Sequence, residues 1–226
     1  MRRNFSGKLW RVENSDAFAL NDNVEGSLED IDILNQFADL TADPLITNTR
    51  ASQLYSDLIF RHFSHALPVP AQFVGRFKPE FYTRNAFYGG LKLSTAVYEA
   101  SYYFMKERMH LPEATSVTAS KISFNVDFSD PNALDVQNHP HVLLLTNRRT
   151  WADSWVFIKT VTTDSVVYPS ARHTEGFCVL CYEIGFLATT TSTPETLNFV
   201  YDREKEMCIV FKGRSAIETI HWRTVS

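Results

Sequence analysis

Residues 121–128 alternate polar and apolar side chains at every position, and no other stretch constrains the fold of this chain as strongly. In an extended strand, this alternation places the four apolar side chains on one face and the polar ones on the other. The segment is therefore predicted to be a strand that covers a hydrophobic core with one face.

Strands and helices are expected to alternate irregularly along the rest of the chain. Helices are predicted over 50–66 and 150–161, and a third helix is expected to run to about Met109 with Ser94 or Thr95 as its cap. Further strands are predicted over 8–13, 85–88, 166–168, 177–182, 197–201 and 207–211. The polar run 202–206 between the last two strands indicates a hairpin, and the Gly89-Gly90 pair indicates a turn. An irregular order that ends in a hairpin favours an α+β fold with a mixed sheet over a doubly wound parallel sheet.

The composition is that of an ordinary globular domain, because 44% of the 226 residues are hydrophobic and 21% are charged. The net charge of −4 argues against a nucleic-acid-binding surface spread over the protein, so no direct DNA binding is expected. The basic residues 1–8 are not followed by an apolar segment, and no run approaches the roughly 18 apolar residues of a membrane span. With three cysteines, the chain is expected to be a cytoplasmic protein rather than a disulfide-stabilised or membrane protein.

Common cofactor and metal motifs are missing from the sequence, which contains no G-x-G-x-x-G, P-loop or H-E-x-x-H pattern. Cys178 and Cys181 form a C-x-x-C pair, but this pair lies in an apolar, strand-like segment and has no second pair to complete a zinc site. His62 and His65 share a helix face without a third ligand nearby. No metal site is therefore predicted.

Glu99 is the single charge in the helical stretch 95–105. Its neighbours three and four residues away are Thr95, Ala96, Tyr102 and Tyr103, so its carboxylate is expected to be partly desolvated. Such a carboxylate needs a hydrogen-bond donor or a cation nearby. Glu99 is therefore a candidate functional residue, although a glutamate paired for structural reasons at the edge of the apolar stripe would show the same pattern.

Two further polar segments stand out against their surroundings. Ser170 and Arg172 follow the predicted strand 166–168, where Pro169 ends strand pairing, so both project polar groups at a strand end. Arg76 lies between aromatic segments. A turn serine and surface arginines would explain these residues equally well.

In this order the segments resemble the RES-domain toxins, a family named after its Arg, Glu and Ser. The match runs through Gly75-Arg76-Phe77, Phe87-Tyr88-Gly89, Thr95-Ala96 with Glu99, and Tyr168-Pro169-Ser170-Ala171-Arg172, with Leu9-Trp10-Arg11-Val12 as the opening strand. This chain has Val-Gly-Arg-Phe where the family commonly has Gly-Gly-Arg-Trp. The resemblance implies a single domain over residues 1–226, in which 13–74 is a helix-containing N-terminal insertion that matches the family poorly.

The resemblance implies an ADP-ribosyltransferase-like fold, a mixed sheet flanked by helices, that consumes NAD⁺. Family members act as toxins that break the nicotinamide–ribose bond by phosphorolysis or hydrolysis, or that transfer ADP-ribose to a protein. NAD⁺ would then be a substrate rather than a recycled cofactor, with inorganic phosphate as co-substrate in phosphorolysis. The resemblance also implies a protein partner, an Xre-like helix-turn-helix antitoxin that holds the toxin inactive and binds DNA in its place.

By the same resemblance, the expected catalytic residues are Arg76, Glu99 and Ser170, and the expected substrate-binding residues are Arg11, Tyr88 and Arg172. Cleavage of an N-glycosidic bond develops oxocarbenium character, which a fixed carboxylate at Glu99 would stabilise. Arg76 and Arg11 suit pyrophosphate because a guanidinium donates several hydrogen bonds in one plane. Tyr88 would stack on nicotinamide or ribose, and Ser170 would orient the ribose or the attacking group.

Two other functions stay open at this point. The same groups would serve the transfer of ADP-ribose to a specific protein target, and the fold would also suit a non-catalytic interaction domain. Following labelled NAD⁺ into free ADP-ribose, ADP-ribose-1″-phosphate or labelled protein distinguishes these alternatives.

Overall fold

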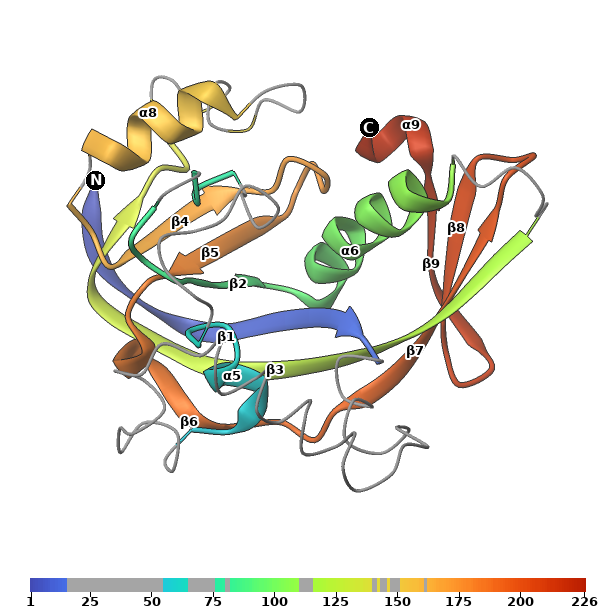
Figure 1. Cartoon of the computed structure of the whole chain (residues 1–226), viewed down its shortest axis with the longest axis horizontal. Coiled ribbons are helices and arrows are strands. Elements are labelled where there is room, and N and C mark those ends of the chain that lie inside the picture. The colour runs from blue at the N-terminus through green and yellow to red at the C-terminus, as the bar shows by residue number, and fades with distance from the viewer. Residues whose placement is uncertain are drawn as a thin grey trace, which may run out of the picture.

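The computed structural model describes residues 1–15, 55–64, 76–79, 82–109, 116–139, 142, 146, 151–160 and 162–226 (Figure 1). The strands are β1 (Arg2–Asn14), β2 (Phe87–Gly90), β3 (Ser116–Asp135), β4 (Ser165–Pro169), β5 (Phe177–Cys181), β6 (Leu187–Thr191), β7 (Glu195–Asp202), β8 (Met207–Lys212) and β9 (Ser215–His221). The helices are α5 (Asp57–Phe60), α6 (Leu93–Arg108), α8 (Ala152–Thr160) and α9 (Trp222–Val225), with a short 3-10 helix η2 (Ile184–Phe186).

The strands form one mixed sheet of nine strands in the order β1-β2-β5-β4-β3-β7-β8-β9, with β6 paired to β3. Strand β1 also pairs with β3, so the path β1-β2-β5-β4-β3 returns to its beginning and closes a ring. Strands β3 and β4 run parallel, whereas the other described pairs are antiparallel. The predicted α+β fold with a mixed sheet and flanking helices is confirmed.

Strand β3 contains the alternating segment 121–128 but extends over 20 residues. It pairs with β1 along most of that strand and with β7 over residues 116–123. It therefore joins the closed ring to the open part of the sheet formed by β7, β8 and β9, as Figure 1 shows. Half-buried alternation indicated the strand, whereas its length depends on partners that are distant in sequence.

Two local predictions are corrected by the structure. Gly89 and Gly90 lie within β2 rather than in a turn. At Gly90, β2 passes very close to the start of α6. A Cβ on Gly90 would lie 2.8 Å from the backbone N of Ala96, closer than real Cβ contacts allow. Within the described part of the predicted helix 50–66, only Asp57–Phe60 is helical, and residues 61–63 form turns.

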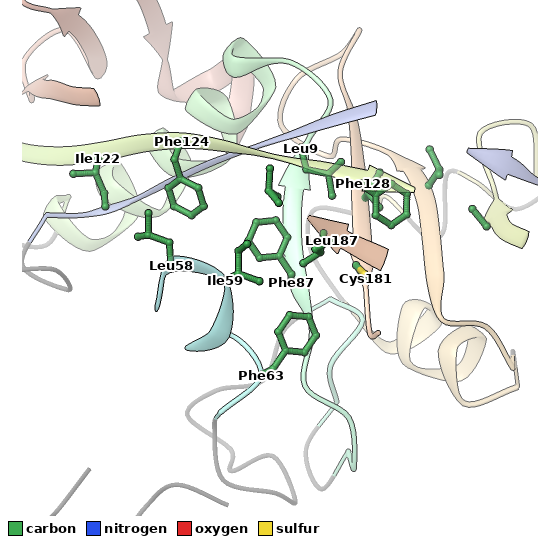
Figure 2. Close-up of a cluster of buried hydrophobic side chains, with 14 residues drawn as sticks. Leu9, Leu58, Ile59, Phe63, Phe87, Ile122, Phe124, Phe128, Cys181 and Leu187 are labelled. Carbon is green, nitrogen blue, oxygen red and sulfur yellow. The ribbon is translucent and has the colours of Figure 1, made fainter. Parts of the chain in front are cut away.

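Helix α6 packs against the β1–β2 part of the ring and against β7, β8 and β9. Its residues Val97, Phe104 and Met105 belong to the hydrophobic cluster formed with these last three strands. A second cluster fills the ring side, where Leu58, Ile59 and Phe63 of the α5 region meet side chains of β1, β2 and β3 (Figure 2). Helix α6 is therefore fixed by the first of these clusters and by its contacts with β1 and β2.

Candidate functional site

A cavity of about 600 Å³ lies between β1, β2 and α6. Its size is within the range of pockets that enclose small organic ligands. Five of the six residues singled out from the sequence line it: Arg11, Arg76, Tyr88, Glu99 and Arg172. The sixth, Ser170, contacts Glu99 directly, so the structure brings all six together although they are spread over 160 residues of sequence.

Glu99 and Ser170 form the closest polar contact among these six residues. The Ser170 hydroxyl donates to Glu99 Oε1 at 2.6 Å. The same hydroxyl oxygen accepts the backbone N–H groups of Arg172, at 3.1 Å, and His173, at 2.9 Å. Because its lone pairs face the backbone and its proton faces the carboxylate, Ser170 fixes the orientation of Glu99.

Arg11, on β1, is held by two acceptors. Its Nε donates to Glu13 Oε1 at 2.8 Å, and its Nη1 donates to the backbone oxygen of Tyr88 at 3.2 Å. Burial lowers the pKa of the Arg11 guanidinium, while Tyr88 opposes this shift. Even a lowered arginine pKa leaves the group charged at neutral pH.

The Glu13 carboxylate also contacts two residues that follow α5. Arg61 Nη2 donates to Glu13 Oε2, and His62 Nε2 lies 2.5 Å from Glu13 Oε1. The Glu13 side chain is 9% exposed, so these contacts lie in a partly desolvated environment. Sequence analysis did not select Glu13 or Arg61, and it considered His62 only as half of a metal pair whose other member, His65, lies outside the described residues.

Arg76 belongs to the Glu99 side of the cavity. Burial raises the pKa of Tyr103, and the nearby charge of Glu99 adds to this shift, whereas Arg172 and Arg76 oppose it. Tyr103 lies one helical turn after Glu99 on α6. The carboxylate and both guanidinium groups therefore act on the same phenol and share one electrostatic environment.

Cys178 lies against this group, with its sulfur 4.0 Å from Glu99 Oε1. Burial raises the pKa of the Cys178 thiol well above its ordinary value, and the Glu99 carboxylate adds to this shift. The thiol is consequently protonated at neutral pH, which does not suit a nucleophile or a metal ligand. The described residues contain no group of three or more His, Cys, Asp or Glu side chains that could hold a metal ion.

The cavity carries net positive charge although the chain is acidic. The described lining includes six basic side chains, Arg11, Arg61, Arg76, Lys78, Lys121 and Arg172, and three acidic ones, Glu13, Glu99 and Glu107. The whole chain has a net charge of −4. A cavity whose charge is opposite to that of its surroundings favours an anionic ligand.

The family model described as "RES domain" matches residues 47–202, more than half of the chain. The chain belongs to the RES-domain family. No curated protein matches the sequence. Among solved structures, the MbcT–MbcA toxin–antitoxin complex of M. tuberculosis contains a similar chain, with 13% sequence identity, a TM-score of 0.40, and coverage of 84% of this chain and 85% of that chain.

The match to the RES domain spans most of the candidate site. Arg76, Tyr88, Glu99, Ser170 and Arg172 lie inside the matched residues, whereas Arg11 and Glu13 precede them. Strand β1 nevertheless pairs with β3 along its length and forms one wall of the cavity. In the described part of the RES domain, no helix is both long and apolar enough to cross a membrane.

Proposed function

We propose that this RES-domain protein is a toxin that degrades NAD⁺ by cleaving the bond between nicotinamide and ribose. The observation that carries the proposal is the Ser170–Glu99 pair, an oriented carboxylate in a cavity with net positive charge. This combination suits a ligand that is anionic along its pyrophosphate and becomes locally cationic at its reacting ribose.

The proposed reaction requires stabilisation of a cation more than proton transfer. The C–N bond breaks, its electron pair goes to the pyridinium nitrogen, and nicotinamide leaves as a neutral molecule. The ribose carbon gains oxocarbenium character, which the Glu99 carboxylate stabilises electrostatically. Attack by water then gives ADP-ribose and a proton, whereas attack by inorganic phosphate gives ADP-ribose-1″-phosphate.

Other residues of the cavity are proposed to bind the pyrophosphate and the nicotinamide ribose of NAD⁺. Arg76 and Arg11 both line the cavity and suit the pyrophosphate oxygens, for which planar guanidinium groups are good donors. Tyr88, on β2, also lines the cavity and suits stacking against the nicotinamide or the ribose. NAD⁺ would be consumed, so no recycled cofactor is needed.

A toxin of this kind needs an inhibitor, and we propose a separate antitoxin protein of the helix-turn-helix type. A partner that covers the cavity would present carboxylates to the arginines proposed to bind pyrophosphate. DNA binding would belong to that partner, because the toxin chain itself is acidic.

The test uses purified wild-type protein and the variants Glu99→Gln and Glu204→Gln. The first change keeps the shape of the side chain and removes its charge, whereas Glu204 is exposed in the turn between β7 and β8 and serves as the control. We expect wild type and Glu204→Gln to release nicotinamide from NAD⁺ at equal rates, and Glu99→Gln to be about 100-fold slower or more.

Mass spectrometry of the products separates the alternatives. Free ADP-ribose indicates hydrolysis, ADP-ribose-1″-phosphate indicates phosphorolysis, and a mass increase on a protein indicates ADP-ribosyl transfer. Undiminished turnover by Glu99→Gln would refute the role of the carboxylate. If the wild type leaves NAD⁺ intact, the proposal fails and a non-catalytic interaction domain becomes the better description.

A further inference from the structure

The turn that joins β4 to β5, residues 170–176, is called the Ser170 loop below. The Ser170 N–H donates to the Gly176 oxygen and the Gly176 N–H donates to the His173 oxygen, both at 2.8 Å. A Cβ on Gly176 would lie 2.6 Å from Thr95 Oγ1, so the loop backbone packs directly against α6. The loop is therefore closed on itself and pressed onto the helix that carries the reactive carboxylate.

Four residues on one face of α6 contact this loop, at the spacing of two successive helical turns: Thr95, Tyr98, Glu99 and Tyr102. Thr95 Oγ1 lies 3.0 Å from His173 Nδ1, and the Tyr98 ring stacks on the His173 ring with centroids 4.4 Å apart. The Arg172 guanidinium carbon lies 3.4 Å from the centre of the Tyr102 ring. The Ser170–Glu99 hydrogen bond lies between these two sets of contacts along the helix.

Arg172 also connects the loop to the C-terminal helix α9. Its side chain is buried and its Nη1 donates to the backbone oxygen of Val225. Trp222 at the start of α9 stacks on Tyr102, with ring centroids 5.5 Å apart and planes 7° apart. Tyr102 thus contacts both the Arg172 guanidinium and Trp222 of α9. Through these contacts the Ser170 loop, α6 and α9 pack together.

We propose that Arg172 is a positioning residue that ties α9 to the Ser170–Glu99 pair, rather than a group that binds the substrate. The Arg172 backbone N–H holds the Ser170 oxygen while its side chain holds Val225 and Tyr102. Arg172 is only 4% exposed, and turning it towards a ligand would leave the buried Val225 carbonyl and the Tyr102 ring without their cation, which is unfavourable. The proposal makes α9 part of the active site and rests on the proposed function for its kinetic readout.

If Arg172 has this role, its loss should change the position of the Glu99 carboxylate. A carboxylate that stabilises a transition state must be held to within a fraction of an ångström, and its supporting contacts decide that precision. Loss of the Arg172 side chain would loosen the Ser170 loop and reduce kcat. It would have little effect on substrate affinity, because Arg11 and Arg76 are proposed to hold the pyrophosphate.

The test compares Arg172→Met, Arg172→Lys and Trp222→Leu with the matched control Arg84→Met. Arg84 also lies over a tyrosine ring, 4.6 Å from Tyr182, and donates to the Thr163 oxygen at 2.8 Å, but it contacts neither Ser170 nor Glu99. We expect kcat for NAD⁺ cleavage to fall about 10-fold or more in Arg172→Met with KM within about 3-fold of wild type. The kcat of Arg172→Lys should lie between those of Arg172→Met and wild type, because lysine keeps the positive charge. The kcat of Arg84→Met should stay within about 2-fold of wild type.

Hydrogen exchange tests the same proposal without any turnover. The amides of Arg172 and His173 should exchange at least about 10-fold faster in Arg172→Met and Trp222→Leu than in wild type or Arg84→Met. Amides of β3 should keep their protection, which shows that the variants are folded. If the wild type cleaves no NAD⁺, the proposed function fails, and this measurement still decides the positioning role.

A rise in KM with unchanged kcat in Arg172→Met would overturn the proposal and restore the substrate-binding role. Unchanged exchange of the Ser170 loop in both Arg172→Met and Trp222→Leu would overturn it as well.

Discussion

At the level of single residues, Glu13 contacts three basic side chains in the wall of the cavity. Its carboxylate meets Arg11, Arg61 and His62, which come from β1 and from the α5 region. The two guanidinium groups repel each other when brought together in a partly desolvated cavity, and the nearby charge of Arg11 lowers the pKa of Arg61 beyond the effect of burial. Glu13 therefore stabilises the cavity wall while it sets the direction of Arg11.

We expect Glu13→Ala to lower the free energy of unfolding by about 2 kcal/mol, because it leaves partly buried cations without their shared carboxylate. Glu107→Ala is the control, since Glu107 is 61% exposed and pairs only with Arg108 at the surface in the described chain. That exposed pair is worth less than about 1 kcal/mol. Urea denaturation of both variants measures the difference, and equal losses would contradict this account.

At the level of elements, β2 and the start of α6 lie in close contact beside the cavity. Strand β2 provides Tyr88, and α6 provides Glu99, 11 positions further along the chain. The two elements approach closely because Gly90 carries no side chain, and Gly89 in the same way allows β2 to approach β1. A Cβ at Gly89 would lie 2.7 Å from the Cβ of Leu9 on β1.

Gly90→Ala is expected to destabilise the protein by about 2 kcal/mol or more, since the added methyl group would meet backbone atoms that cannot easily move. The matched control is Gly7→Ala on β1, where nothing lies within 4 Å of the added Cβ. That substitution should change stability by less than about 1 kcal/mol. Thermal and urea unfolding of the two variants provide the comparison, and similar stabilities would argue against the close approach.

At the scale of the whole molecule, the three hydrophobic clusters enclose all three cysteines as free thiols. Burial raises the pKa of Cys181 and of Cys208 to about 12, and raises that of Cys178 well above its ordinary value. An unfolded chain releases these protons near pH 9, whereas the folded protein keeps them. The contribution of the thiols to stability is therefore complete below about pH 9 and is lost as pH rises towards 12.

The protein should consequently become less stable between pH 9 and pH 10.5. Each thiol contributes up to about 1.4 kcal/mol of loss per pH unit above pH 9. Urea denaturation across this range measures the slope, and Cys208→Ala should reduce it by the share of one thiol. A stability that does not change with pH over this range would show that the thiols ionise alike in both states.

Local patterns of the sequence were sufficient for most elements and for the main site residues. Alternation predicted the central part of β3, and the helix signals predicted α6 to within three residues at its start and one at its end, although Lys92 rather than Ser94 or Thr95 precedes the helix. The lone charge of Glu99 marked a carboxylate that needs a donor, and Ser170 is that donor. Strands β6 and β9 were not predicted, because short exposed segments carry little periodicity and are held by pairing with β3 and β8.

By itself, the sequence determined the types of the elements and the residues that bring charge into apolar surroundings, because both depend on neighbours within two turns or a few strand positions. Only the tertiary structure decided that β1 closes the ring, that Glu13 meets Arg61 across 48 residues, and that Arg172 joins the Ser170 loop to α9. The physical reason is that such contacts depend on strand register and on the packing of distant segments. Neither leaves a periodic signal along the chain.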